Sequence, residues 1–373
     1  MKTLLFIGHT YHQKTKSSVF LLDLLRQDYL ITEFYMDSEQ PLEYEPLGEL
    51  QQKEFDVLLI WQVMPKTTEL KKYISWQHTV FFPMYDHFVA IGGFNAKIWK
   101  EYQEALIVSF SKTLCDDLCT CGFDARYIQY FPEPGKIGSW GAEDSLFFWQ
   151  RRTNLNMSTL AQAATNLDLK KVHLHAAPDP GHSTLHPSAF DEGVASFFEN
   201  IACSESVWFA KKEQMYETME QSGLYMAPRH MEGIGMSFLE AMAHGRCVIA
   251  PDRPTMNEYI TDGVNGLLYP WDDTSESHCG ASLKRSAKTI REIQQNAYQT
   301  IVDGRKKWDT DKHLILEWLQ QEARPDRKKL RINSIFYDWN NLPRTKWFAI
   351  TFIAKNLFLF RFRDINSFHH RKK

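Results

Sequence analysis

The residues best suited to chemistry in this sequence gather between Pro228 and Glu240. Two carboxylates, Glu232 and Glu240, stand eight positions apart, with Gly233 and Gly235 between them. Apolar residues on both sides predict a strand, a glycine loop and then a helix. Backbone N–H groups at a helix start lack partners within the helix, and the helix dipole favours negative charge there. The segment therefore predicts a site for an anion, and a phosphate-bearing ligand suits it.

Two interpretations stay open for Ser237 and Glu240. Their Ser-x-x-Glu spacing is that of a capping box, in which both side chains satisfy backbone N–H groups at a helix start. The other interpretation is that they contact the ligand. Glu232 has no comparable structural role, and its alternative is an ordinary loop carboxylate exposed to solvent.

A longer motif surrounds the two glutamates. Residues 228–245 read Pro-x3-Glu-Gly-x-Gly-x4-Glu-Ala-Met-Ala-x-Gly, and residues 248–250 and 257–268 continue with Val-Ile-Ala and Asn-Glu-Tyr-Ile-Thr-Asp-Gly-Val-Asn-Gly-Leu-Leu. This pattern resembles the retaining GT-B glycosyltransferases of family four. The resemblance implies two Rossmann-like, doubly wound α/β domains facing across a cleft, with a C-terminal helical extension. It also implies a nucleoside diphosphate sugar as donor substrate, with no cofactor and no metal.

The resemblance assigns roles to residues of the motif. It implies that Glu232 is catalytic and hydrogen-bonds hydroxyls of the donor sugar, and that Glu240 binds the nucleotide ribose. The backbone of the glycine loop and helix start would hold the diphosphate. The donor-binding residues implied here are Gly233, Gly235, Met236, Ser237 and Glu240.

Family members usually open the second domain with a strand that ends in Gly-Arg, followed by a Lys, and both cations neutralise the leaving diphosphate. Here Gln150 replaces the glycine, Arg151 and Arg152 follow it, and no Lys occurs before Lys170. We expect Arg151 to be catalytic and Arg152 to assist in donor binding. The alternative is a pair of solvated arginines at a strand end.

The first domain is expected to contribute three further site residues. A predicted strand ends in Asp86-His87, and relatives carry a His in this region. We expect His87 to donate to the diphosphate or orient an acceptor hydroxyl, with Asp86 on the acceptor side. Gly8 follows the first strand and is expected to border the donor, whereas the departure from the usual glycine-rich loop weakens any role for His9 or His12.

The expected reaction is transfer of a sugar to a saccharide or lipid-linked acceptor hydroxyl with retention of anomeric configuration. Such a hexosyltransferase belongs in the synthesis of cell-surface polysaccharide, lipopolysaccharide or glycolipid. Two alternatives stay open: a sugar-nucleotide epimerase of the same fold, and a non-catalytic subunit that binds sugar nucleotides. The missing Lys motivates the second alternative, and so does the loop after the first strand, which lacks the family's usual glycine-rich form.

Short apolar runs alternating with amphipathic stretches predict the elements that position these residues. Strands are expected at 3–8, 30–36, 56–61, 79–84, 105–110 and 126–131, and then at 146–149, 171–176, 207–211, 224–228, 247–250 and 266–269. We expect an acceptor-side domain at 1–135 and a nucleotide-sugar domain at 136–305. A helix crossing back to the first domain is expected at 306–323, and a basic aromatic tail at 324–373.

Composition limits the remaining possibilities. The chain has 373 residues, is 43% hydrophobic and has a short apolar start, so we expect two folded domains in the cytosol. Its six cysteines are expected to be free thiols, with a zinc site at Cys115-x3-Cys119-x-Cys121 as the weak alternative.

Charge is distributed unevenly along the chain. Residues 324–373 hold 13 Lys or Arg and 3 Asp, which leaves 30 basic against 43 acidic residues elsewhere. The apolar stretch at 347–360, flanked by basic residues, is too short to span a bilayer. It predicts peripheral attachment to an anionic membrane surface, and packing against the body or a second subunit is the alternative. No recognisable module supports nucleic-acid binding.

Overall fold

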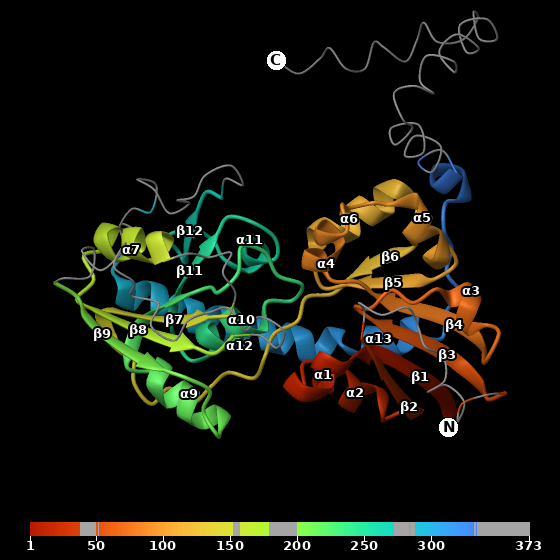
Figure 1. The fold of residues 1–373 in the computed structure, drawn as a ribbon, viewed down its shortest axis with the longest axis horizontal. Coiled ribbons are helices and arrows are strands. Elements are labelled where there is room, and N and C mark those ends of the chain that lie inside the picture. The colour runs from red at the N-terminus through yellow and green to blue at the C-terminus, as the bar shows by residue number, and fades with distance from the viewer. Residues whose placement is uncertain are drawn as a thin grey trace, which may run out of the picture.

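The computed structural model describes residues 1–37, 50, 52–151, 157–178, 200–271, 283, 288–331 and 333. It consists of two α/β units side by side, each built on a parallel six-stranded sheet (Figure 1). We call the unit with strands β1–β6 the first domain and the unit with strands β7–β12 the second domain. The doubly wound α/β architecture expected from the sequence is confirmed.

The first domain alternates strands with short helices. Its strands are β1 (Lys2–His9), β2 (Tyr29–Met36), β3 (Glu54–Trp61), β4 (Ser75–Phe82), β5 (Leu106–Ser109) and β6 (Ala125–Tyr127). Its helices are α1 (Thr10–Thr15), α2 (Val19–Leu25), α3 (Thr67–Leu70), α4 (Tyr85–Ala90), α5 (Ala96–Trp99) and α6 (Lys112–Cys121), with a 3-10 turn at Lys100–Tyr102. The strand order is β2-β1-β3-β4-β5-β6.

The second domain repeats this rhythm. Its strands are β7 (Ala142–Gln150), β8 (Lys171–Ala176), β9 (Ala202–Ser206), β10 (Ser222–Met226), β11 (Cys247–Pro251) and β12 (Leu267–Tyr269). Its helices are α7 (Met157–Asn166), α9 (Lys212–Met219), α10 (Met236–Ala243) and α11 (Met256–Tyr259). In the strand order β12-β11-β10-β7-β8-β9, the chain proceeds outward from β7 on one side and outward from β10 on the other, so the order reverses between β10 and β7 while all strands stay parallel. In open parallel sheets ligands bind at such a reversal, beyond the carboxyl ends of the strands.

One predicted strand is misplaced. The sequence analysis expected a strand at 207–211, where Val207 and Trp208 are apolar, but the observed strand β9 ends at Ser206. Val207 and Trp208 lie 60% and 54% exposed beyond it. The true strand is a polar edge strand, held to β8 by the parallel ladder and by hydrogen bonds between its serines and His173. Hydropathy alone therefore placed this strand five residues too far along the chain.

Burial explains why these segments form strands. Leu4, Leu5, Phe6 and Ile7 in β1 are all 0% exposed. Helices cover both faces of a parallel sheet, so its strands read as continuous apolar runs. One apolar cluster extends from β1 through Phe147 of the second sheet, and the two domains therefore share part of their core.

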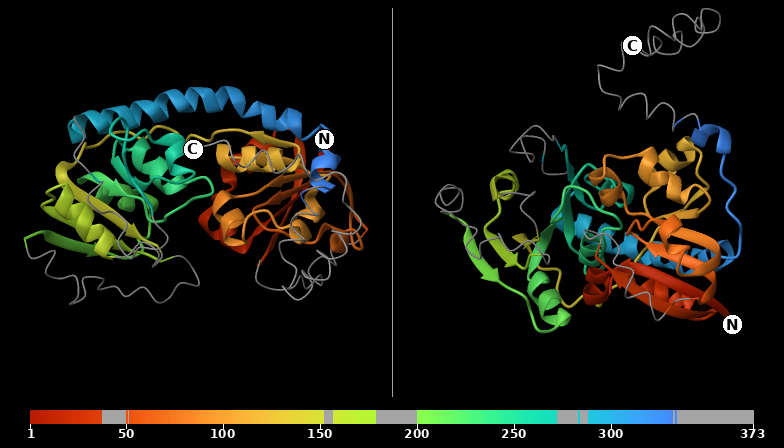
Figure 2. Two further views of the ribbon diagram at one scale, coloured as in Figure 1. Left: turned by 90° about the horizontal axis from the view of Figure 1, so that it is seen from above. Right: turned by 45° about the vertical axis from the view of Figure 1, so that its right-hand side comes forward.

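A long helix joins the domains on one side. Helix α12 (Ile290–Asp311) begins with a Thr289–Glu292 capping box and is followed by α13 (His313–Trp318). In Figure 2 it runs along both domains, and its Trp308 ring packs 5.2 Å from that of Tyr130 in the first domain. The helix expected at 306–323 is thus the end of a longer helical stretch that does return to the first domain.

A carboxylate from the second domain caps a helix of the first. Glu258 in α11 accepts hydrogen bonds from the backbone N–H groups of Lys112 (2.7 Å) and Thr113 (2.9 Å) and from the Ser111 hydroxyl (2.8 Å). These groups form the N-terminus of α6, where a negative charge is favoured by the helix dipole. The contact fastens α6 to the second domain.

Replacement of Glu258 with glutamine is expected to lower the free energy of unfolding by about 1–3 kcal/mol, because charge-assisted bonds to the α6 start are lost. Thermal and urea unfolding measure this change. Glu104→Gln is the matched control, since Glu104 pairs with Arg327 at 2.9 Å on the surface with both side chains well exposed. Equal stability of the two variants would contradict the interdomain capping role.

The described cysteines are free thiols, as the sequence predicted. Within the described part of the chain, no three His, Cys, Asp or Glu side chains gather in a way that suits a metal ion. The same part of the chain contains no helix that is both long and apolar enough to cross a membrane. Most of the basic aromatic tail, residues 334–373, and Cys279 lie outside the described residues.

Candidate active site

The predicted anion site forms at the start of helix α10. Strand β10 is buried along its whole length, and the loop after it leads to Gly235, which is the N-cap of α10 with φ +83°. A Cβ on Gly235 would lie 1.9 Å from the Phe238 ring, so only glycine fits. The first N–H groups of α10 follow directly, and they lie beside the strand reversal of the second sheet. This is the geometry that suits a diphosphate.

The capping-box interpretation of Ser237 and Glu240 is wrong. The N-cap is Gly235, two residues earlier, and it makes no side-chain cap bond. Ser237 is instead a buried residue inside the first turn. Glu240 accepts a 2.6 Å bond from Nζ of Lys212, on α9. Since neither side chain caps the helix, loss of the Glu240 carboxylate costs no helix cap.

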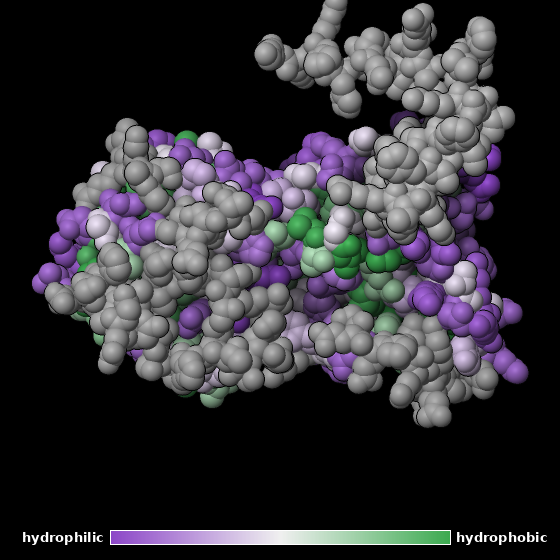
Figure 3. Space-filling view, turned by 45° about the horizontal axis from the view of Figure 1, so that its top comes forward, coloured by the Kyte–Doolittle hydropathy of each residue, from purple (hydrophilic) through white to green (hydrophobic). Residues whose placement is uncertain are grey.

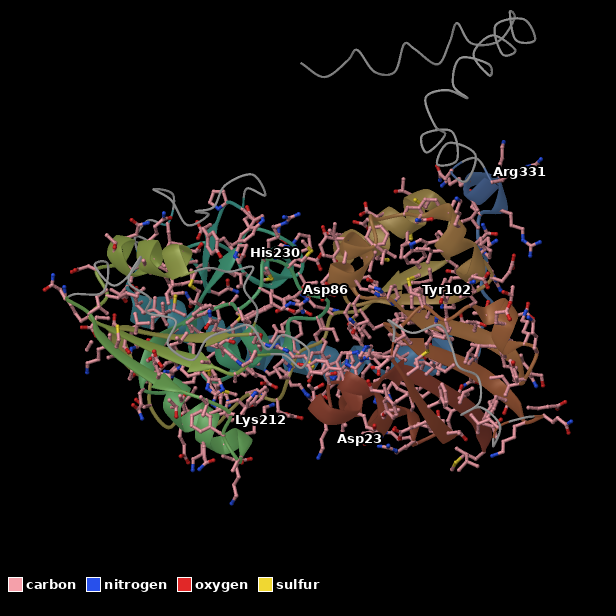
Figure 4. All side chains as sticks on the ribbon, in the orientation of Figure 1. Asp23, Asp86, Tyr102, Lys212, His230 and Arg331 are labelled. Atoms are coloured by element: carbon pink, nitrogen blue, oxygen red, sulfur yellow. The ribbon has the colours of Figure 1, made fainter. Side chains whose placement is uncertain are left out.

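Glu232 lies in a buried charge cluster that joins the domains. Its Oε2 accepts a 3.1 Å bond from Nη1 of Arg229, and Nη2 of Arg229 donates at 2.6 Å to Oδ2 of Asp86 in helix α4. The side chains of Arg229, Asp86 and Glu232 are only 15%, 11% and 7% exposed. Burial alone would lower the pKa of Arg229, but the two carboxylates raise it above its usual range. Figure 4 shows Asp86 in the middle of the molecule, where the two domains meet.

Gly233 is where the glycine loop touches the first domain. A Cβ at this position would lie 2.8 Å from Cβ of Met84 and 3.1 Å from Oδ1 of Asp86. The backbone of the loop therefore packs directly against the start of α4. Glycine is needed here for close approach between the domains.

Arg151 follows strand β7, on the other side of the strand reversal from Glu232. Its Nη2 donates at 3.0 Å to the hydroxyl of Tyr11 in α1, and its guanidinium lies 5.0 Å from the centre of the Trp149 ring. Arg151 thus stands at the domain junction, where a leaving diphosphate at the α10 start would need a cation. Arg152, its expected partner, lies outside the described residues.

His87 belongs to helix α4 and faces the end of β3. Its Nδ1 is 3.0 Å from the backbone oxygen of Gln62, an acceptor, so Nδ1 carries the proton and Nε2 of the neutral ring is an acceptor. Gln62 itself has φ +66°, a left-handed conformation that is uncommon for a residue other than glycine. The Gln62 carbonyl at the end of β3 therefore fixes the His87 tautomer.

Gly8 and its neighbours occupy the end of β1. Gly8 lies within the strand, and a Cβ there would come 2.8 Å from the Phe6 ring, which explains the glycine by packing. Its expected role in donor binding stays a prediction. His12 is buried, and burial lowers its pKa to about 4 against the opposing effect of a hydrogen bond with the Gln62 side chain. His12 is thus a neutral residue of the junction.

Sequence reasoning gave no role to Tyr11, Lys212 and Arg229 and discounted His12, although all four lie around the candidate site. Of these, Arg229 alone carried a usable signal, since it is a charged residue inside the glycine-loop motif. The others are brought to the site by contacts far apart in sequence.

Comparison with known proteins gives a family for part of the chain and a fold for most of it. Residues 147–281 match the family model described as Glycosyl transferases group 1. The matched stretch covers less than half of the chain and resembles the group 1 glycosyltransferases. The resemblance to GT-B enzymes is thereby confirmed for the domain that contains the Glu232–Glu240 motif.

Solved structures share the fold over most of the chain, beyond the stretch that matches the family model. Sucrose-phosphate synthase from Thermosynechococcus elongatus matches with a TM-score of 0.62 at 12% identity, over 85% of this chain and 100% of that one. Alr3699/HepE of Anabaena, in complex with UDP and glucose, matches with a TM-score of 0.51 at 12% identity, over 83% of this chain and 99% of that one. The fold is therefore GT-B.

TarM matches with a TM-score of 0.49 and 15% identity, over 74% of this chain but only 57% of TarM. A comparison with curated protein sequences gives no match for the chain.

Proposed function

We propose that this protein transfers a sugar from a nucleoside diphosphate sugar to an acceptor hydroxyl, with retention of anomeric configuration. The observation that carries the proposal is that Arg151 follows β7, while Glu232 and the α10 start follow β10, and these two strands flank the strand reversal of the second domain. A cation, a carboxylate and a helix N-terminus together suit a diphosphate joined to a hydroxyl-rich sugar.

The main catalytic task in such a transfer is electrostatic. Negative charge grows on the departing diphosphate while the sugar becomes oxocarbenium-like, so groups that stabilise this charge lower the barrier. In our proposal the α10 N–H groups and Arg151 face the diphosphate, with Arg152 beside them. Glu232 holds sugar hydroxyls, and Glu240 exchanges its Lys212 contact for the ribose. These groups meet the electrostatic need without a metal.

Retention in our proposal follows a front-face route. The donor diphosphate helps deprotonate the acceptor hydroxyl on the same face from which it departs, so no enzyme nucleophile is needed. His87 contributes from the first domain, since its Nδ1–H is engaged by Gln62 and its Nε2 is an acceptor. In this arrangement it orients the acceptor hydroxyl.

A donor panel tests the proposal. UDP-, GDP-, ADP- and dTDP-linked hexoses are offered with a set of saccharide and lipid-linked acceptors, and release of nucleoside diphosphate is measured. UDP-glucose is the first donor to try, because the structurally similar HepE is described in complex with it. We expect release with one nucleotide class and a product with retained configuration. An epimerised donor formed without any acceptor would instead indicate an epimerase.

We propose that the acceptor is lipid-linked and that the tail brings the protein to the cytoplasmic face of an anionic membrane. The basic residues of the tail and the apolar residues that gather on the first domain beside the junction support this proposal (Figure 3). Flotation with vesicles containing phosphatidylglycerol tests it. Truncation after Ala323 should reduce binding, and undiminished binding would rule out a role for the tail.

A further inference from the structure

Arg229 is the one residue of the glycine-loop motif whose charge the proposed reaction does not yet use. It lies between Pro228 and Glu232, and its guanidinium contacts carboxylates of both domains, Asp86 at 2.6 Å and Glu232 at 3.1 Å. The separation of 143 residues between Asp86 and Arg229 makes this a contact of tertiary structure alone.

The surroundings of Arg229 argue against a direct role in holding the diphosphate. Its positive charge is already opposed by two buried carboxylates, and buried opposite charges interact more strongly than solvated ones. Withdrawal of Arg229 toward a phosphate would leave Asp86 and Glu232 as two like charges in a buried site, which is unfavourable. In the proposed function, Arg151 is the cation assigned to the leaving group.

The contact can also transmit domain position. Gly233 is packed so closely that a single added carbon would collide with Met84 and would lie 3.1 Å from Oδ1 of Asp86. Movement of the first domain away from the second therefore removes Asp86 from Arg229. The Glu232 carboxylate would then keep its guanidinium partner, but that partner would lose its second anchor.

We propose that Arg229 is a positioning residue that couples closure of the first domain, through Asp86, to the orientation of Glu232 toward the donor sugar. This inference rests on the proposed function of Glu232. It also changes the expected role of Asp86, which acts through Arg229 instead of touching the acceptor.

The test compares Arg229→Met, Asp86→Asn and the double variant with the unchanged protein. UDP-glucose and UDP are the probes. If the donor panel selects another sugar nucleotide, that donor and its free nucleoside diphosphate take their place. We expect transfer to fall about 10²-fold in each single variant, as a misplaced site residue can cause. The affinity for UDP, which lacks the sugar, should change by less than about twofold, because the phosphate contacts are kept.

The double variant decides whether the two residues act together. If Asp86 works only through Arg229, the double variant loses no more activity than Arg229→Met alone, and the free-energy changes are strongly non-additive. Additive losses would overturn the coupling. A loss of UDP affinity as large as the loss of transfer would assign Arg229 to the diphosphate, and full activity of Arg229→Met would also overturn the inference.

Two controls keep the outcome interpretable. Thermal unfolding of each variant reports on the fold, and the double variant removes both charges, so it avoids an unpaired Asp86 if Arg229→Met is unstable. Arg229→Lys keeps one charge but lacks the planar fork that reaches two carboxylates, so we expect it to recover transfer only in part. An active Glu232→Gln protein would instead reject the proposed function itself.

Discussion

Replacing Glu232 with glutamine is expected to lower kcat/KM for sugar transfer by about 10²–10³-fold, the range seen when one group that stabilises a transition state is removed. Glutamine keeps the shape of the side chain but removes the charge that binds the donor hydroxyls. Initial rates of nucleotide release with the selected donor measure the effect. The amide can still accept a bond from Arg229, so the fold is expected to survive.

Two comparisons make the Glu232 result specific. Glu317→Gln makes the same chemical change on an exposed face of α13, and its rate should equal that of the unchanged protein. Affinity for the free nucleoside diphosphate should also be kept in Glu232→Gln. A Glu232→Gln protein with normal transfer would refute the assignment of the donor-sugar site to this loop.

Replacing Arg151 with methionine is the second change with a large expected effect. Loss of the cation that faces the leaving diphosphate should lower kcat by about 10²–10³-fold. Arg151→Lys keeps the charge without the planar geometry and should recover part of the rate. Single-turnover kinetics separate this loss in the chemical step from any change in product release.

Tyr11→Phe separates two roles of Arg151, its hydrogen bond to the first domain and its charge facing the diphosphate. It removes the hydroxyl that accepts the 3.0 Å bond from Arg151 and keeps the arginine charge. Loss of one such bond should cost less than about tenfold. If Tyr11→Phe lost as much activity as Arg151→Met, Arg151 would act by joining the domains. Arg152→Met, measured in parallel, shows how the two adjacent arginines share the task.

Local sequence patterns predicted most of the fold. Nearly all expected strands overlap observed ones, because a strand buried on both faces must be apolar along its length, as in β1 and β3. The prediction of a strand at 207–211 was wrong because it also relied on apolar residues. Strand β9 lies at a sheet edge and is polar, while the apolar Trp208 follows it in an exposed loop. Hydropathy located the edge strands β2, β6 and β12 but missed β9, whose residues are mostly polar.

The candidate site divides in the same way. The sequence by itself determined the glycine loop, the helix that follows it and the places of Glu232 and Glu240 in them, since loops and helices are predicted from neighbouring residues. Only the tertiary structure decided that Ser237 and Glu240 do not cap this helix, because a cap depends on where the first turn begins.

Contacts across the junction were likewise beyond local pattern. Asp86 meets Arg229 across 143 residues and Tyr11 meets Arg151 across 140 residues. Such pairs carry no periodicity, since they depend on how two sheets are placed relative to each other. The sequence therefore determined which groups could bind a diphosphate sugar. The packing of the two domains decided which charges hold those groups in place.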